Sequence, residues 1–117
     1  MTDQTILLLE DVDNLRLLYQ LWLEQAGYHV VTRPSSKSIE QLIEHFQPAL
    51  LITDLIMPQN DGMEGVFKIL GRYQIPIIAI SGDETHLNVV KRVVAATLVK
   101  PFTNEQLLEA VKQALGA

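Results

Sequence analysis

The sequence has 117 residues, of which 48% are hydrophobic and 20% are charged, and it contains no cysteine. This length allows one domain with a single core, and the lack of cysteine excludes disulfides and thiolate metal sites. The net charge of -5 argues against direct binding to nucleic acid, which needs a basic surface. No apolar run approaches the ~20 residues of a membrane span and the amino terminus does not resemble a signal peptide, so we expect a cytoplasmic protein.

Short apolar runs alternate with segments in which apolar residues recur at helical spacing. In the first half of the chain this pattern predicts a strand over 6–9, a helix over 13–26, a strand over 28–32, a helix over 39–46 and a strand over 50–53. Asp13 is the expected N-cap of the first helix, and Gly27 is placed to end it. The third strand runs directly into Asp54, and a dense turn signal follows over 58–62.

The second half of the chain continues this alternation. It predicts a short helix over 63–70, a strand over 75–80, a short helix over 87–94, a strand over 97–99 and a final helix between Thr103 and Gly116. Thr103 and Gln106 form the capping box that begins the last helix. No linker, internal repeat or low-complexity segment interrupts the chain, so we expect one domain over residues 1–117.

Five strands that alternate with five helices indicate βαβ units, and such units form a parallel sheet with helices on both faces. Right-handed crossovers leave few topologies, and the flavodoxin-like strand order 2-1-3-4-5 is the usual solution for five units. We therefore predict an α/β fold, a flavodoxin-like (βα)5 three-layer sandwich with a five-stranded parallel sheet. Its topological switch point lies between the first and third strands.

Polar side chains follow four of the five strands. Glu10 and Asp11 follow the first strand, Asp54 the third, Ser81 the fourth and Lys100 the fifth. All these strand ends lie at one edge of a parallel sheet, and the switch point brings Asp11 beside Asp54. Crowded carboxylates repel one another unless a cation joins them, and a hard divalent cation such as Mg²⁺ prefers oxygen ligands. We therefore predict a Mg²⁺ site at this edge.

These residues suit an in-line phosphoryl transfer. Asp54 is the expected nucleophile, the metal and Lys100 would balance the charge on the phosphoryl oxygens, and Ser81 would bind the product. Each residue alone also has a purely structural explanation, because Asp54 and the Glu10-Asp11 pair can cap turns or helices and an isolated lysine is usually solvated. Their convergence at one edge favours a functional site.

The chain resembles, over its whole length, the receiver domains of two-component response regulators, particularly single-domain regulators of the chemotaxis type. The matching residues are Glu10-Asp11, Asp54 with Met57-Pro58 and Asp61-Gly62, Ser81-Gly82 and Lys100-Pro101-Phe102. The resemblance implies that Asp54 accepts the phosphoryl group. It also implies that Glu10, Asp11, Asp54 and the backbone carbonyl of Ile56 hold Mg²⁺.

The resemblance further implies that Ser81 is the switch hydroxyl, that Lys100 contacts the phosphate and that the Lys100-Pro101 bond is cis. A histidine kinase or a phosphotransfer protein would be the donor, and an unidentified downstream protein would be the target. His29, His45 and His86, which we place on a strand, a helix and a loop, lie in no phospho-donor motif. The protein is then no enzyme beyond its own phosphorylation and dephosphorylation.

Three features depart from the family pattern. The family commonly has Tyr or Phe three residues before the lysine, where this chain has Thr97. The segment from Ser81 to Lys100 is shorter by about a helical turn and lacks the usual glycine before the fifth strand. The position two after Asp54 is Ile56, where many rapidly self-hydrolysing receivers have a polar residue. From the first departure we expect altered switching, and from the third we expect slow loss of the phosphoryl group. From the second we expect an altered partner-binding face, through which a homodimer is possible.

The sequence also allows other functions. A receiver-like module could bind a partner without phosphorylation. The missing aromatic residue and the short fourth helix favour this alternative, whereas the intact acidic site argues against it. A flavodoxin-type cofactor binder is disfavoured because Glu10 and Asp11 would repel a mononucleotide phosphate. A phosphatase of the haloacid-dehalogenase type is disfavoured because it needs a second Asp where this chain has Ile56.

Overall fold

The computed structural model describes residues 4–57 and 62–116, so the predicted turn over Pro58 to Asp61 lies outside the described residues. Helices and strands alternate along the described residues. In order they are β1 (Thr5–Leu9), α1 (Asp13–Gln25), β2 (His29–Arg33), α2 (Ile39–Phe46), β3 (Leu50–Asp54), α3 (Gly62–Leu70), β4 (Ile77–Ser81), α4 (Glu84–Val90), β5 (Ala96–Val99) and α5 (Asn104–Leu115).

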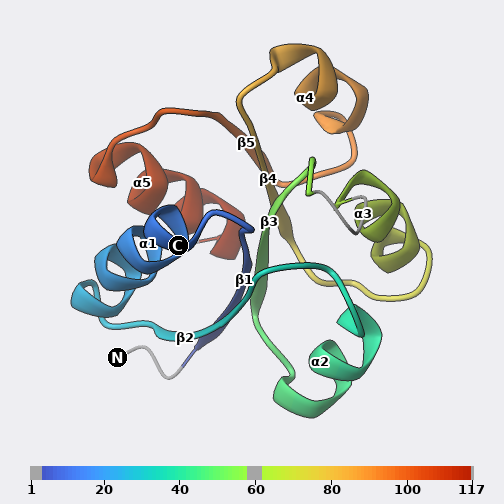
Figure 1. Ribbon diagram of the computed structural model, residues 1–117. Coiled ribbons are helices and arrows are strands. Elements are labelled where there is room, and N and C mark those ends of the chain that lie inside the picture. Colours follow the sequence, from blue (N-terminus) through green and yellow to red (C-terminus); the bar gives the residue numbers. More distant parts are fainter. Residues whose placement is uncertain (1–3, 58–61, 117) are drawn as a thin grey trace.

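The five strands form one parallel sheet in the order β2-β1-β3-β4-β5. Helices α1 and α5 cover one face of this sheet, and α2, α3 and α4 cover the other (Figure 1). The predicted α/β flavodoxin-like three-layer fold and its strand order are therefore confirmed. The first and third strands are neighbours, as the switch point requires, with Leu9 paired in register to Thr53.

The core consists of two apolar layers, one on each face of the sheet. Side chains alternate along a strand, so Leu7 and Leu9 of β1 pack toward α2, α3 and α4, while Ile6 and Leu8 pack toward α1 and α5. The three inner strands β1, β3 and β4 are almost completely buried on both faces. This burial explains why they appear in the sequence as continuous apolar runs.

Some predicted element ends were wrong. Val12, not Asp13, is the N-cap of α1, and it makes no side-chain capping bond. Asp13 is the first helical residue, and its carboxylate instead pairs with Arg16 at 2.6 Å. Strand β4 begins at Ile77 rather than at position 75, because Pro76 has no backbone N–H to donate to the sheet.

Helix α4 also differs from its prediction. It begins at Glu84, three residues before the first apolar position of the pattern, and ends at Val90 instead of continuing to position 94. Asp83 caps it by accepting a hydrogen bond from the Thr85 backbone N–H at 2.8 Å. The predicted shortness of this helix is confirmed, as is the capping box of Thr103 and Gln106 at the start of α5. No helix in the described part of the chain is both long and apolar enough to cross a membrane.

Candidate functional site

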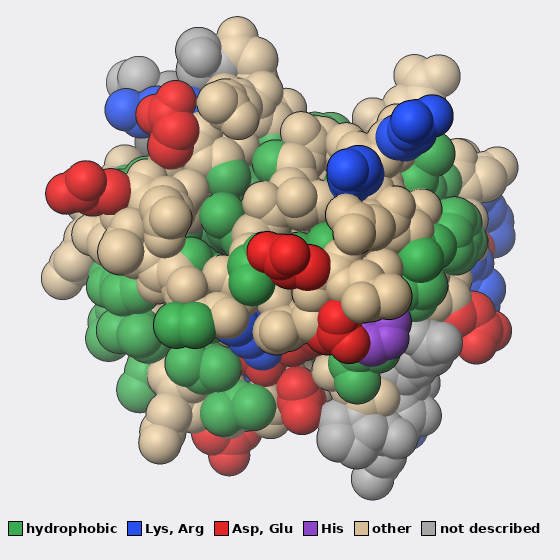
Figure 2. Space-filling model, turned by 90° about the horizontal axis from the view of Figure 1, so that it is seen from above, with side chains coloured by type: hydrophobic (Ala, Val, Ile, Leu, Met, Phe, Trp, Pro, Cys, Tyr) green, Lys and Arg blue, Asp and Glu red, His purple; other side chains and the backbone are tan. Residues whose placement is uncertain are grey.

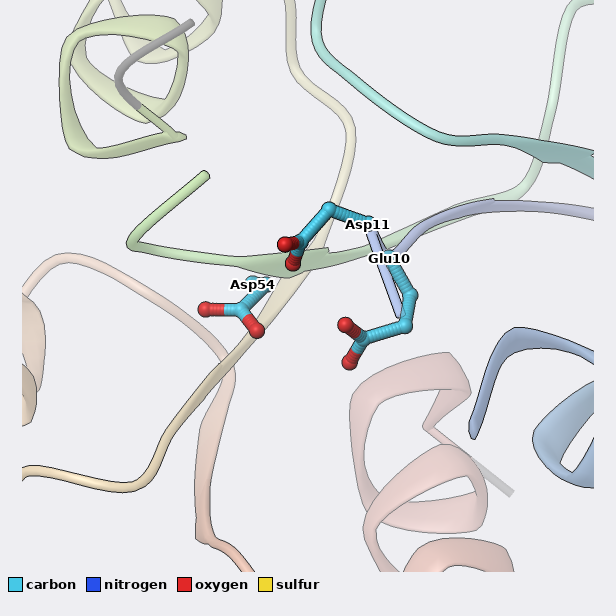
Figure 3. A group of neighbouring side chains, drawn as sticks. All are labelled: Glu10, Asp11 and Asp54. Carbon is cyan, nitrogen blue, oxygen red and sulfur yellow. The ribbon is translucent and has the colours of Figure 1, made fainter. Parts of the chain in front are cut away.

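The five chemically active residues predicted from strand ends lie together at the carboxyl edge of the sheet. Glu10 and Asp11 follow β1, Asp54 ends β3, Ser81 ends β4 and Lys100 follows β5. Oxygen atoms of the three acidic residues lie within 4.8 Å of one another. Figure 3 shows their carboxylates pointing into the same space beyond the strand ends. Such a set of hard oxygen donors suits a divalent cation such as Mg²⁺.

Lys100 joins two of these carboxylates. Its Nζ lies 2.6 Å from Glu10 Oε1 and 2.5 Å from Asp54 Oδ2. Burial alone would lower the pKa of Lys100, but hydrogen bonds and charge attraction from Asp54 and Glu10 outweigh burial and raise this pKa above its usual value. The lysine is therefore a permanent cation between two buried carboxylates at neutral pH.

Glu10 is the most deeply buried acid of the site, with no exposed surface. Burial raises the pKa of its carboxyl, and the hydrogen bonds from Lys100 and from the Val12 backbone N–H only partly offset this effect. The backbone carbonyl of Glu10 also accepts a hydrogen bond from Arg16 Nη1 at 2.9 Å. Arg16 thus ties the first turn of α1 to the acidic loop.

Short-range hydrogen bonds hold Asp54 in place. The Ile56 backbone N–H donates to Asp54 Oδ1 at 2.9 Å, and the Thr53 hydroxyl donates to the Asp54 backbone carbonyl at 2.9 Å. The N–H of Leu55 then continues the sheet pairing by donating to the Ile80 carbonyl. The Ile56 N–H at Oδ1 and the Lys100 ammonium at Oδ2 thus fix the orientation of the Asp54 carboxylate, the candidate nucleophile.

Ser81 is buried, and its hydroxyl accepts a hydrogen bond from the Asp83 backbone N–H at 3.0 Å. Its backbone carbonyl accepts from the Lys100 N–H at 2.9 Å, so the ends of β4 and β5 are joined directly. The Lys100-Pro101 peptide bond is cis, as predicted. Next to this bond, the ring of Phe102 stacks on Tyr19 of α1, with ring centroids 4.8 Å apart.

A depression of about 450 Å³ opens at this edge and exposes the polar groups. It is lined by Asp11, Val12, Asp54, Ile56, Ser81, Gly82, Asp83, His86 and Lys100. The Ile56 side chain is 51% exposed at its rim. His86 and Arg16 were missed by sequence reasoning, which placed His86 in a loop, whereas it lies in the first turn of α4. The only signal in the sequence is that Arg16 and His86 each lie three residues after an aspartate, Asp13 and Asp83 respectively.

A family model described as the response regulator receiver domain matches residues 6–112. The chain belongs to this receiver family. Response regulator RR06 from Streptococcus pneumoniae serotype 2 (strain D39) is 33% identical over 113 residues, which cover 92% of this chain and 51% of that protein. This receiver thus spans about half the length of the curated relatives that it matches.

Solved receiver structures share the fold. The receiver domain from the hybrid histidine kinase CckA is 33% identical, with a TM-score of 0.78 over 95% of this chain and 98% of that chain. The chemotaxis response regulator CheY4 of Vibrio cholerae is 24% identical, with a TM-score of 0.86 over 97% of this chain and all of that chain. At that identity the second comparison supports the fold alone.

The buried carboxyl of Glu10 leads to a prediction about stability. Without Mg²⁺, Glu10→Gln should raise the free energy of unfolding at pH 7 by about 0.5–2 kcal/mol, the usual gain on relieving a destabilised functional site. The raised pKa of Glu10 means that the folded protein holds this proton more tightly than the unfolded chain. The resulting stability is present below pH 4.5 and is lost as the pH rises through the raised pKa.

Urea unfolding of the wild type and of Glu10→Gln, between pH 4.5 and 8 with EDTA, checks this prediction. The part of the pH dependence that belongs to Glu10 should disappear in the variant. Glu109→Gln, at an exposed position of α5, is the matched control and should behave as the wild type. A variant less stable than the wild type at pH 7 would contradict the argument.

Proposed function

We propose that this receiver accepts a phosphoryl group on Asp54 from a histidine kinase or a phosphotransfer protein, in a Mg²⁺-dependent reaction. The observation that carries the proposal is the convergence of Asp11, Asp54 and Lys100 at one accessible depression, with the buried carboxylate of Glu10 directly behind them. Membership of the receiver family supports the same conclusion. We also propose a cytoplasmic location, where such donors present their phosphohistidines.

The chemistry follows from the donors and charges of the site. An oxygen of the Asp54 carboxylate attacks the phosphorus of the phosphohistidine, the P–O bond forms, and the P–N bond to the donor breaks. Lys100 is held beside Asp54, and its ammonium can form an ion pair with the phosphoryl oxygens when the group is transferred. The Ser81 hydroxyl can rotate from its Asp83 contact and donate to the new phosphoryl group.

Glu10, Asp11 and Asp54 are the proposed protein ligands of Mg²⁺, with the backbone carbonyl of Ile56 as a further ligand. The three carboxylates fit the ion because they are close together, largely buried and only partly neutralised by one lysine. When bound, Mg²⁺ neutralises charge on the transferring phosphoryl oxygens. All other contacts to the phosphoryl group come from the chain itself.

Intact mass after incubation with acetyl phosphate tests the proposal, because this small donor needs no partner protein. With Mg²⁺ the mass should increase by one phosphoryl group, and with EDTA in place of Mg²⁺ it should not. Isothermal titration calorimetry with fluoroberyllate, a phosphoryl mimic, gives a second readout. Failure of both the adduct and fluoroberyllate binding would instead favour a receiver-like module that binds its partner without phosphorylation.

Two features favour the alternative function, a receiver-like module that binds its partner without phosphorylation. Thr97 is half-buried and cannot act as the aromatic switch of the family, and α4 is only seven residues long. Without that ring, a phosphorylation signal would have to pass to a downstream protein through another movement of the α4–β5 region, whereas a phosphorylation-independent module needs no such movement. Exposed Val89, Val93 and Val99 give this region an apolar surface suited to a protein partner.

Position 56 should control the lifetime of the phosphorylated state. Ile56 offers no hydrogen bond to water, so we expect Ile56→Asn to accelerate loss of the phosphoryl group by about tenfold, a gain of about 1.4 kcal/mol in transition-state stabilisation. Decay is followed by intact mass after removal of acetyl phosphate. Ile56→Val keeps the position apolar and is the control. Equal or slower decay in Ile56→Asn would refute the idea.

A further inference from the structure

His86 lies in the same depression as the proposed phosphorylation site. It belongs to the first turn of α4, and the depression that it lines also includes Asp54, Ser81 and Lys100. A histidine side chain next to an acidic one is visible on the face of the molecule shown in Figure 2. Imidazole is the side chain best suited to take up and release a proton near neutral pH.

Asp83 lies beside this imidazole. The Asp83 Oδ1 atom accepts the Thr85 backbone N–H at 2.8 Å, and Asp83 Oδ2 lies 3.7 Å from His86 Nδ1. The Nδ1 atom is buried and has no hydrogen-bond partner among the described residues, although the side chain as a whole is 39% exposed. Nδ1 is therefore the nitrogen on the Asp83 side of the ring, and the exposed part of the His86 side chain belongs to a residue that lines the depression.

Asp83 is suited to support a positive charge on this ring. Hydrogen bonds from Thr85 lower the pKa of the Asp83 carboxyl, and the bond from the Thr85 backbone has the larger effect. Asp83 therefore stays ionised. The Asp83 N–H also donates to the Ser81 hydroxyl. A movement of Ser81 toward a phosphoryl group therefore acts directly on the turn that carries Asp83 and leads into His86.

The other described groups around the depression are poor proton acceptors for water. Lys100 is held in its protonated form, Ile56 is apolar, and the carboxylates of Asp11 and Asp54 are engaged by the proposed metal and the phosphoryl group. Among the described lining residues, only Asp83 and His86 remain as bases. Of these two, the imidazole has the higher intrinsic proton affinity.

We infer that His86, oriented by Asp83, takes the proton from the water that hydrolyses the acyl phosphate of Asp54. This inference rests on the proposed function. The water oxygen forms a bond to phosphorus, the bond between phosphorus and the Asp54 oxygen breaks, and its electron pair returns to the Asp54 carboxylate. The water proton passes to His86 Nε2 and then to solvent, and inorganic phosphate leaves.

Two rates separate this role from a structural one. Phosphorylation by acetyl phosphate consumes no water, whereas decay of the isolated phosphoprotein does. His86→Gln should slow decay by about 10²-fold, the low end of what general acid–base catalysis contributes, and should slow phosphorylation far less. Asp83→Asn should slow decay by a smaller factor, because Asn still caps α4 but removes the charge opposite the ring.

His29→Gln makes the same chemical change at an exposed position of β2 and is the matched control. Decay of His86→Gln at the control rate, or a parallel fall in both phosphorylation and decay, would overturn the inference while leaving the proposed function standing. A wild type that forms no adduct and binds no fluoroberyllate would refute the proposed function itself, and the inference with it. Intact mass measures both rates on the full chain.

Discussion

Protein carrying Asp54→Asn is expected to gain no phosphoryl group under conditions that modify the wild type completely. The amide is not nucleophilic enough to attack phosphorus, and the loss of one negative charge also weakens the proposed metal site. The substitution should preserve the fold, because the amide oxygen can still accept the Ile56 N–H that now binds Asp54 Oδ1. Intact mass after incubation with acetyl phosphate and Mg²⁺ is the measurement.

Asp13→Asn is the matched control for this experiment. Asp13 is an exposed carboxylate near the start of α1 whose partner is Arg16, and it does not line the depression. It should gain the phosphoryl group as the wild type does. An adduct of normal yield on Asp54→Asn, located by peptide mapping on another residue, would contradict the assignment of the acceptor.

Replacing Lys100 by Met is expected to destabilise the protein by about 3 kcal/mol at pH 7 without Mg²⁺. Removal of one partner of a buried ion pair leaves uncompensated charge, and here it leaves two carboxylates, Glu10 and Asp54, facing each other. The raised pKa of Lys100 means that its contribution is fully present below the unfolded lysine pKa of about 10.4 and is lost only as the pH rises through the folded value.

Urea unfolding with and without Mg²⁺ checks this result. The metal should restore part of the lost stability, since it supplies positive charge between the same carboxylates. Lys112→Met, at an exposed position of α5, controls for the loss of any lysine and should change stability by less than about 0.5 kcal/mol. A Lys100→Met protein as stable as this control would show that the lysine is not needed to balance the acidic cluster.

The sequence contained most of what defines the sheet edge. Continuous apolar runs located the buried strands, and a parallel sheet must bring their polar ends to one side, so Asp11, Asp54, Ser81 and Lys100 could be grouped without coordinates. Their grouping depends on topology alone. It therefore does not require knowledge of any side-chain conformation.

The remaining features depend on which local hydrogen bonds and ion pairs form, and the spacing of apolar residues does not determine these. Helix α4 begins with the polar residues 84–86, so its first turn, which holds His86, could not be recognised from hydrophobic periodicity. Asp13 is a residue type that often caps helices, but its carboxylate pairs with Arg16 and Val12 is the N-cap of α1. The sharing of one ammonium between Glu10 and Asp54 depends on rotamers, which sequence spacing does not determine.

That shared ammonium neutralises part of the negative charge of the resting site and couples the binding of its ligands. Lys100 already forms ion pairs with the carboxylates of Glu10 and Asp54, so a metal ion that binds these carboxylates must compete with the lysine. Each contact that the ion displaces frees the ammonium to turn toward an incoming anion. Metal and phosphoryl group should therefore increase each other's affinity by the same factor, because such coupling is reciprocal. A single side chain that changes partners would then give the site positive cooperativity without a change in the fold.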